Sequence, residues 1–150
     1  MAAISIAGRV AQEMNTEIGQ LVGYSVRFDE MISTNTRIKF MTEGMLLRES
    51  LKDPLLKVYR MIILDEAHER SVQTDILFAI VKKAYISRKK LGLLPLKLII
   101  MSATMNVEQF SNYFNSAPVY FISGRQHPIE VSYLKATKPV QTNSFAFFML

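Results

Sequence analysis

Two short polar segments carry the side chains best suited to chemistry in this sequence. Asp65-Glu66-Ala67-His68 directly follows the apolar run at 61–64, and Ser102-Ala103-Thr104 directly follows the apolar run at 96–101. A carboxylate pair at the end of a strand suits phosphoryl transfer, in which one acid holds Mg²⁺ and the other orients the attacking water. The alternative is that both acids only begin a helix, where anions meet the positive end of the helix dipole.

The elements that must position these segments alternate between strand and helix. Apolar periodicity predicts helices at 3–14, from an N-cap at Thr42 through Leu51, at 76–85 and at 107–114, and strands at 23–28, 37–41, 61–64, 96–101, 119–122 and 129–134. The continuous apolar runs at 61–64 and 96–101 are typical of buried strands. This order predicts an α/β fold with a mainly parallel sheet and crossover helices. Such sheets bind ligands at the carboxyl ends of their strands, where both polar segments are expected.

The composition is that of a folded domain. The chain has 150 residues, of which 49% are hydrophobic and 21% charged, so one domain with a sizeable core is expected. No apolar run approaches the roughly 18 to 20 residues that span a bilayer, so no membrane partner is predicted and the protein is expected to be intracellular. Cysteine is absent, and His68 and His127 do not have the spacing of zinc ligands.

The charge balance favours polyanionic partners only weakly. Eighteen Lys and Arg against 13 Asp and Glu give a formal net charge of +5. The densest basic stretch comes late in the predicted helix at 76–85 and its continuation. There, cations complement the helix dipole and solvate an outer face, which is the preferred interpretation for Lys82, Lys83, Arg88, Lys89 and Lys90.

Asp65-Glu66-Ala67-His68-Glu69-Arg70 resembles motif II of the DEAH-box family of superfamily 2 RNA helicases. By chance, the tetrapeptide at 65–68 would occur in a chain of this length on the order of once in a thousand. Ser102-Ala103-Thr104 resembles motif III of the same family, the stretch from Thr42 to Glu49 resembles motif Ib, and Ile4 to Glu13 resembles the end of motif Ia with its following helix. The likeness runs from about Ala2 to Lys135.

The resemblance implies the first RecA-like motor domain of an ATP-dependent RNA helicase, with ATP and Mg²⁺ as cofactors. Asp65 would hold Mg²⁺ through water, and Glu66 would be the general base for the hydrolytic water. His68 would link the nucleotide site to motif III. Within Ser102-Ala103-Thr104, the two hydroxyl residues would transmit the hydrolysis state to the RNA groove.

The same resemblance implies RNA contacts that grip the backbone with little sequence preference. Thr42, as the N-cap of a helix, would offer a hydroxyl beside free backbone N–H groups, and Gly44 would allow a close approach. Arg9, Arg27 and Phe28 are further RNA-facing candidates. An ordinary helix cap remains the alternative for Thr42. A second RecA-like domain would be the protein partner.

One part of the family pattern is missing. The chain has no Gly-Lys dipeptide, so the Walker A loop and the strand before it are expected to be absent. We therefore expect a partial helicase domain at 1–139 and a divergent, poorly ordered tail at 140–150. The predicted function is that of a fragment of an RNA helicase that couples ATP hydrolysis to RNA or RNP remodelling, with a nuclear or nucleolar address by family. The alternatives are a non-catalytic truncated product that binds RNA or proteins weakly, and a non-functional product.

Overall fold

The computed structural model describes residues 2–103 and 107–122. The chain divides into two compact units, Met1–Val119 and Tyr120–Leu150, and only 120–122 of the second unit are described. Thr104, the strand predicted at 129–134 and the predicted tail therefore lie outside the described residues. Within the described ranges, no helix is both long enough and apolar enough to cross a membrane.

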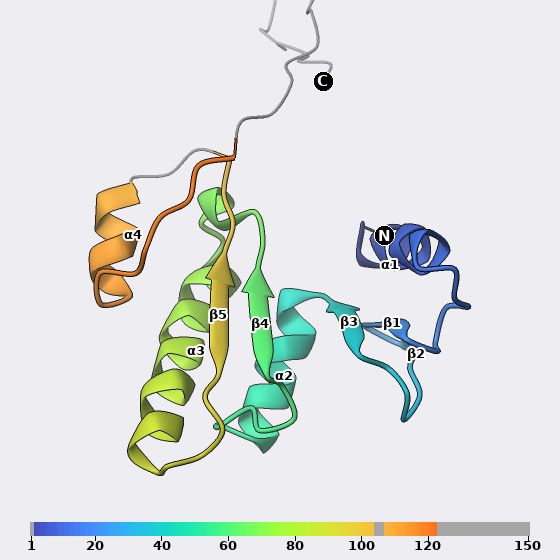
Figure 1. The fold of residues 1–150 in the computed structure, drawn as a ribbon, viewed down its shortest axis with the longest axis horizontal. Coiled ribbons are helices and arrows are strands. Elements are labelled where there is room, and N and C mark those ends of the chain that lie inside the picture. Colours follow the sequence, from blue (N-terminus) through green and yellow to red (C-terminus); the bar gives the residue numbers. More distant parts are fainter. Residues whose placement is uncertain (1, 104–106, 123–150) are drawn as a thin grey trace, which may run out of the picture. The chain divides into compact units, whose positions relative to one another are not determined.

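Residues 2–41 form one helix packed on a three-stranded sheet (Figure 1). Helix α1 (Ala2–Glu13) precedes strands β1 (Val22–Val26), β2 (Asp29–Met31) and β3 (Ile38–Met41). β1 is the central strand, pairing antiparallel with β2 and parallel with β3. The periodic small residues of α1 allow it to lie close to β1, and the core between them contains Ala7, Ala11, Val22 and Tyr24.

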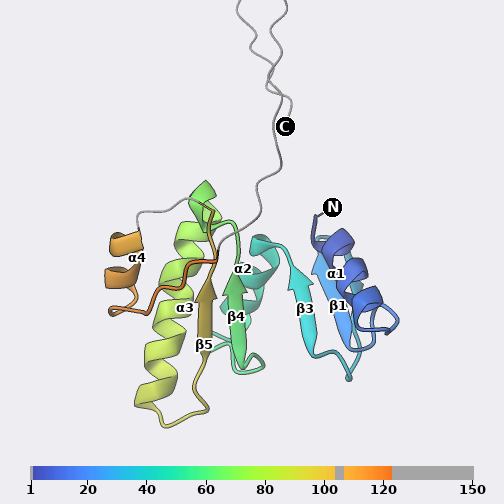
Figure 2. The ribbon, with the colours of Figure 1, turned by 45° about the horizontal axis from the view of Figure 1, so that its top comes forward.

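A second, two-stranded sheet carries the predicted site segments. Strand β4 (Met61–Leu64) pairs in parallel with β5 (Lys97–Ile100), so their carboxyl ends meet at one edge (Figure 2). Helix α2 (Glu43–Lys52) precedes β4, and helix α3 (Val72–Lys90) forms the crossover between the strands. Buried side chains from these elements and from the segments that join them make one core, consisting of Leu46, Leu56, Ile62, Leu64, Ala67, Leu77, Phe78, Val81, Ala84 and Leu96.

Two shorter elements complete the described part of the chain. A 3₁₀ turn, η1 (Ala67–Glu69), follows β4, and helix α4 (Val107–Tyr113) follows β5. The ring of Phe78 on α3 meets Phe110 edge-on at a centroid distance of 5.3 Å and Phe114 at 5.9 Å, which fixes α4 beside α3. The parallel strands and the crossover helix confirm the predicted α/β class. The described strands form two sheets instead of the expected single one, because no ladder joins β3 to β4.

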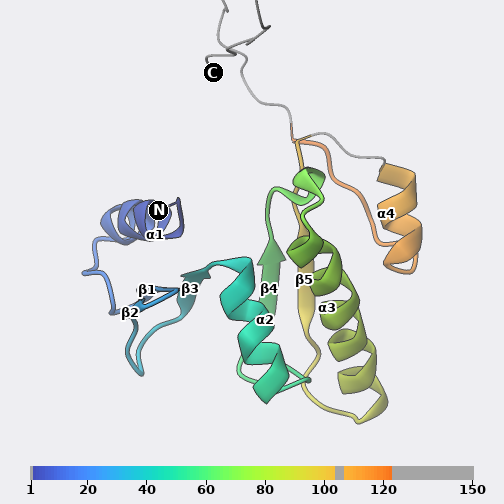
Figure 3. The same ribbon diagram turned by 180° about the vertical axis from the view of Figure 1, so that it is seen from behind.

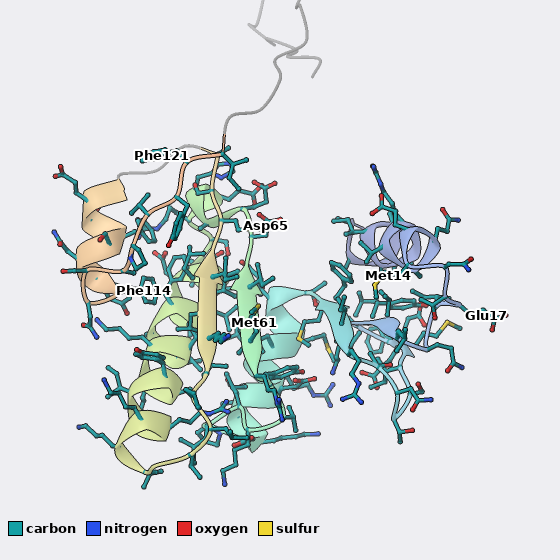
Figure 4. The ribbon with its side chains drawn as sticks, in the orientation of Figure 1. Met14, Glu17, Met61, Asp65, Phe114 and Phe121 are labelled. Atoms are coloured by element: carbon teal, nitrogen blue, oxygen red, sulfur yellow. The ribbon has the colours of Figure 1, made fainter. Side chains whose placement is uncertain are left out.

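The prediction that β4 and β5 are buried strands is wrong for one face of the pair. Ile62 and Leu64 are buried, whereas Met61 and Ile63 are 45% and 51% exposed, and Ile99 on β5 is 40% exposed. Helices α2 and α3 lie on the same face of the two strands (Figure 3), and no described helix lies over the other face, which Figure 1 shows. The position of Met61, one of these exposed residues of β4, can be followed in Figure 4. An apolar run of four residues cannot reveal how many of its faces a domain covers.

Two predicted strands also differ from the structure. The strand predicted at 23–28 ends at Val26, and Arg27 and Phe28 form the turn of a β1–β2 hairpin in which Val26 pairs with Asp29. Phe28 has a φ of 68°, a left-handed conformation that ends an extended strand. Residues 119–122 are exposed and, within the described residues, pair with no strand.

Arg88 does not solvate the outer face of its helix as predicted. Its side chain is only 2% exposed. Its Nε donates to the Leu94 carbonyl at 2.8 Å, and its Nη1 donates to the carbonyls of Leu56 at 3.1 Å and Tyr59 at 2.9 Å. The guanidinium therefore ties the end of α3 to the loops that lead into β4 and β5, which orients both strands.

Candidate functional site

The ends of β4 and β5 are joined by backbone hydrogen bonds that continue past the sheet. The Met101 N–H donates to the Leu64 carbonyl at 2.9 Å, and the Met101 carbonyl accepts from the Ala67 N–H at 3.0 Å. Ala67 is fully buried, so it anchors the turn after β4 in the core. This anchoring brings the segments 65–68 and 102–103 together, as the sequence predicts. Met101 contributes through its backbone, which leaves no signal in the sequence.

The two acids lie in the turn between Leu64 and Ala67. Asp65 and Glu66 are both exposed, and Figure 4 shows Asp65 at the end of β4. The Glu66 N–H donates to Asp65 Oδ1 at 2.8 Å. Glu66 itself has φ 52° and ψ 36°, the left-handed region that non-glycine residues seldom adopt and that is enriched at functional sites. This turn presents both carboxylates to solvent.

The alternative that these acids begin a helix holds only for the short 3₁₀ turn η1, because Glu66 is its N-cap, and not for α3. Helix α3 begins six residues after Glu66, at Val72, and its N-cap is Ser71. The Ser71 hydroxyl accepts a hydrogen bond from the Thr74 N–H at 3.0 Å. Glu66 precedes only the short η1 turn, and its side chain makes no capping bond there. The dipole of α3 therefore does not explain the carboxylate pair.

His68 connects the two segments. The Ala103 N–H donates to His68 Nδ1 at 3.4 Å, and Glu66 Oε2 lies 3.4 Å from the same nitrogen. Nδ1 carries either a lone pair or a proton, so it cannot accept from Ala103 and donate to Glu66 at once. In the neutral ring, an acceptor at Nδ1 places the proton on Nε2. Protonating the ring favours the contact with Glu66 and breaks that with Ala103.

Arg70 and Asp75 brace the start of α3. Arg70 Nε and Nη2 donate to the two Asp75 carboxylate oxygens at 2.7 and 2.9 Å, which is a bidentate pair. This hydrogen bonding lowers the pKa of Asp75 and raises the pKa of Arg70. The guanidinium also lies 5.5 Å from the centroid of the Phe110 ring. Arg70 thus links the end of motif II to both α3 and α4.

The carboxylates at the strand ends suit a metal ion that takes few protein ligands. Within residues 2–103 and 107–122, no group of three or more His, Asp or Glu side chains is arranged to hold a metal ion. Mg²⁺ commonly takes one or two carboxylates and fills its remaining positions with water and phosphate oxygens. Asp65 fits that use, because its carboxylate is exposed at the strand end and one of its oxygens accepts a backbone N–H.

The start of α2 has the backbone geometry predicted for an N-cap at Thr42. Thr42 has φ −76° and ψ 153°, and its carbonyl accepts from the N–H groups of Met45 at 3.0 Å and Leu46 at 3.2 Å. Its hydroxyl makes no capping bond. Thr42 is therefore an N-cap through its backbone, which the alternative of an ordinary helix cap also predicts, and its hydroxyl takes no part in that cap. At Gly44, an added Cβ would only touch Gln73 at 3.8 Å. Internal packing therefore does not require glycine there.

The other RNA-facing candidates lie on separate elements. Arg9 is on α1, where its Nε pairs with Glu13 Oε1 at 2.9 Å and its side chain is 81% exposed. Arg27 lies 4.8 Å from the centroid of the Phe28 ring in the β1–β2 turn. Phe28 is 92% exposed. Within the described part of the chain, these candidates make no hydrogen bond or ion pair with Thr42 or Gly44.

Comparisons with known proteins bear on this arrangement. The DEAD/DEAH box helicase family model matches residues 5–112. The chain is 62% identical over 135 residues to the "ATP-dependent RNA helicase DHX33" of Homo sapiens and 53% identical to the protein of the same name in Drosophila melanogaster. Each match covers 90% of this chain and 19% of the relative, so the chain spans about a fifth of the length of these curated relatives. The family match confirms that the α/β elements form part of a RecA-like fold, and the chain belongs to the DEAD/DEAH box helicase family.

Proposed function

We propose that this chain supplies one wall of the ATP site and part of the RNA-contacting surface of an ATP-dependent RNA helicase. The observation that carries the proposal is the junction of the two strand ends. There, the exposed carboxylates of Asp65 and Glu66 follow β4, and His68 accepts the N–H of Ala103 after β5. The acids that we assign to hydrolysis and the segment that we assign to coupling are therefore linked through His68.

Glu66 is the group that we assign to the hydrolytic water. Its carboxylate is 63% exposed and stands in a left-handed turn whose neighbours are held by the core. A general base must reach the proton that it accepts, directly or through one water, and an exposed carboxylate on a fixed turn can do so. Positioning and electrostatics supply most of the rate acceleration in phosphoryl transfer.

Asp65 would hold Mg²⁺ through water molecules. When bound, Mg²⁺ would neutralise charge on the phosphate oxygens. The bond from the Glu66 N–H to Asp65 Oδ1 limits the rotation of the Asp65 carboxylate. The two neighbouring acids therefore take different roles, one oriented by the backbone and the other extending into solvent.

His68 and Ala103 would pass the state of the nucleotide site to the segment after β5. A shift of the Glu66 carboxylate or of the charge near it changes which partner Nδ1 can keep, because the two contacts exclude each other. Ser102, next to Ala103, would carry that change toward the RNA groove. Thr104, which lies outside the described residues, is proposed for the same role on the resemblance to motif III alone.

RNA would be gripped by its backbone at the start of α2. The first N–H groups of α2 point toward the helix start, and Thr42 adds a hydroxyl that no cap bond occupies. Gly44 leaves open surface beside them. We add Arg9, Arg27 and Phe28 as further contacts from other elements. A second RecA-like domain would complete the groove and the ATP site.

For the chain by itself, we propose weak RNA binding without ATP turnover. The sequence contains no Gly-Lys dipeptide, and therefore no lysine of the kind that contacts the β and γ phosphates in related sites. This absence favours the non-catalytic alternative for the isolated chain. The ATP-dependent activity then belongs to a protein in which these residues are joined to a Gly-Lys-Thr loop and a second motor domain, hereafter the restored protein.

Duplex unwinding by the restored protein tests the proposal. We expect ATP-dependent unwinding of an RNA duplex with a single-stranded overhang, and RNA-stimulated ATP hydrolysis. Ser102→Ala should impair unwinding while leaving most of the hydrolysis, because Ser102 lies on the coupling segment and not among the acids. A restored protein without RNA-stimulated hydrolysis would refute the function. A matched fall of hydrolysis and unwinding in Ser102→Ala would refute the coupling role.

A further inference from the structure

One carboxylate joins the two helices that begin beside the candidate sites. Glu43 is the first residue of α2, and its side chain reaches the start of α3. Its Oε2 accepts from the Ser71 hydroxyl at 2.8 Å, and its Oε1 accepts from the Thr74 hydroxyl. Ser71 and Thr74 are 28 and 31 positions away in sequence. Sequence patterns therefore do not indicate this contact.

The partners of Glu43 belong to the N-terminal turn of α3. Ser71 is the N-cap of that helix, and its oxygen also accepts from the Thr74 N–H at 3.0 Å. Thr74 is only 2% exposed, so its hydroxyl depends on protein partners. The two hydroxyl oxygens lie 2.7 Å apart. When both donate to Glu43, no proton remains between them, so the carboxylate orients the pair.

This contact connects the two proposed sites by a short path. On one side, Glu43 adjoins Thr42 and Gly44, the proposed backbone contacts for RNA. On the other side, Ser71 directly follows Arg70, which ends the motif II segment and pairs with Asp75 on α3. Figures 1 and 3 both show α2 and α3 side by side on one face of the β4–β5 pair. A movement at the start of one helix is therefore transmitted to the start of the other through the Glu43 carboxylate and the hydroxyls of Ser71 and Thr74.

We propose that Glu43 is a positioning residue that couples RNA binding at the start of α2 to ATP hydrolysis after β4. The inference rests on the proposed function, and it assigns to Glu43 a role that neither the acids of motif II nor motif III fill. RNA phosphate held at the α2 start fixes Glu43, which fixes the N-terminal turn of α3 and the motif II turn before it. Without Glu43, both helix starts keep their backbone but lose the link.

The test measures ATP turnover of the restored protein with and without saturating single-stranded RNA. Glu43→Ala should keep a turnover rate without RNA close to that of the unsubstituted protein and should lower the RNA stimulation about tenfold, within the range common for coupled sites. Glu43→Gln, which keeps one acceptor oxygen, should recover part of the stimulation. Glu17→Ala is the matched control, because Glu17 is an exposed glutamate and its loss changes the charge equally.

Thr74→Val provides a second test that leaves Glu43 in place. Valine keeps the shape of threonine without its hydroxyl, so stimulation should again fall, and Glu43→Ala combined with Thr74→Val should lose less than the sum of the two effects. Equal loss of turnover with and without RNA in both single variants would show a purely structural role and overturn the inference. Unchanged stimulation in both would overturn it too. An unsubstituted restored protein that RNA does not stimulate would instead refute the proposed function, and the inference with it.

Discussion

Replacing His68 with alanine should expose the N–H of Ala103 to solvent exchange. The Ala103 N–H lies 3.4 Å from His68 Nδ1, which is long for such a bond, and the imidazole is 28% exposed. The bond therefore belongs at the low end of the range for a net hydrogen bond, about 0.5–1 kcal/mol. Because local opening must break it, its loss should speed amide exchange at Ala103 about two- to fivefold.

Amide hydrogen exchange followed by NMR measures this directly. The Met101 N–H is the internal control, since it donates to the Leu64 carbonyl at 2.9 Å and should exchange equally slowly in both proteins. His68→Asn should keep most of the protection at Ala103, because the asparagine oxygen is attached to Cγ, as Nδ1 is in histidine. Equal exchange at Ala103 in the unsubstituted protein and in His68→Ala would refute the link between the two segments.

Two further predictions concern RNA affinity and alkaline stability. RNA binding by the chain should be weak, and a plot of log affinity against log salt concentration should have a slope near −1.4 to −2.1 if about two or three phosphates are neutralised. In titrations of labelled homopolymeric RNAs, Thr42→Ala and Arg9→Ala should weaken binding equally for every sequence. A changed sequence preference in either variant would contradict the backbone contact. The pKa of Tyr59 is raised above its ordinary 10.0 by burial and by its hydrogen bond to Glu49. As the pH rises, the unfolded chain therefore loses this proton before the folded chain does. The free energy of unfolding that is present below about pH 10 then falls as the pH rises further. Urea unfolding of Tyr59→Phe should show a smaller fall of that free energy at alkaline pH. A loss equal to that of the unsubstituted protein would contradict the assignment.

Local patterns predicted the elements that position the site. The structure confirms the helix predicted from the apolar spacing in α1 and the N-cap position of Thr42. It also confirms that the strand ends at Leu64, where the residues change from apolar to acidic. Helix α3 runs on past the predicted 76–85 to Lys90, and Gly92 just beyond its end takes a φ of 64°, a left-handed conformation that is common after a helix. These features depend on residues within a turn or two of each other, so the sequence carries them directly.

Contacts between distant residues could not be predicted in this way. The burial of Arg88 depends on the carbonyls of Leu56 and Tyr59, 32 and 29 positions earlier. The half-exposed state of β4 depends on which helices cover the sheet and not on the run at 61–64. The contact of His68 with Ala103 spans 35 positions, and it was expected only because the family resemblance implied a link between the two motifs.

The most direct test of the central claim compares ATP binding and ATP hydrolysis in the restored protein and its Glu66→Gln variant. Glutamine keeps the shape of the side chain but cannot accept the proton of the water. We predict a fall in single-turnover hydrolysis of about 10²- to 10⁴-fold with an ATP affinity close to that of the unsubstituted protein. Equal loss of affinity and hydrolysis, or hydrolysis that persists in Glu66→Gln, would contradict the assignment of Glu66 as the base at the end of β4.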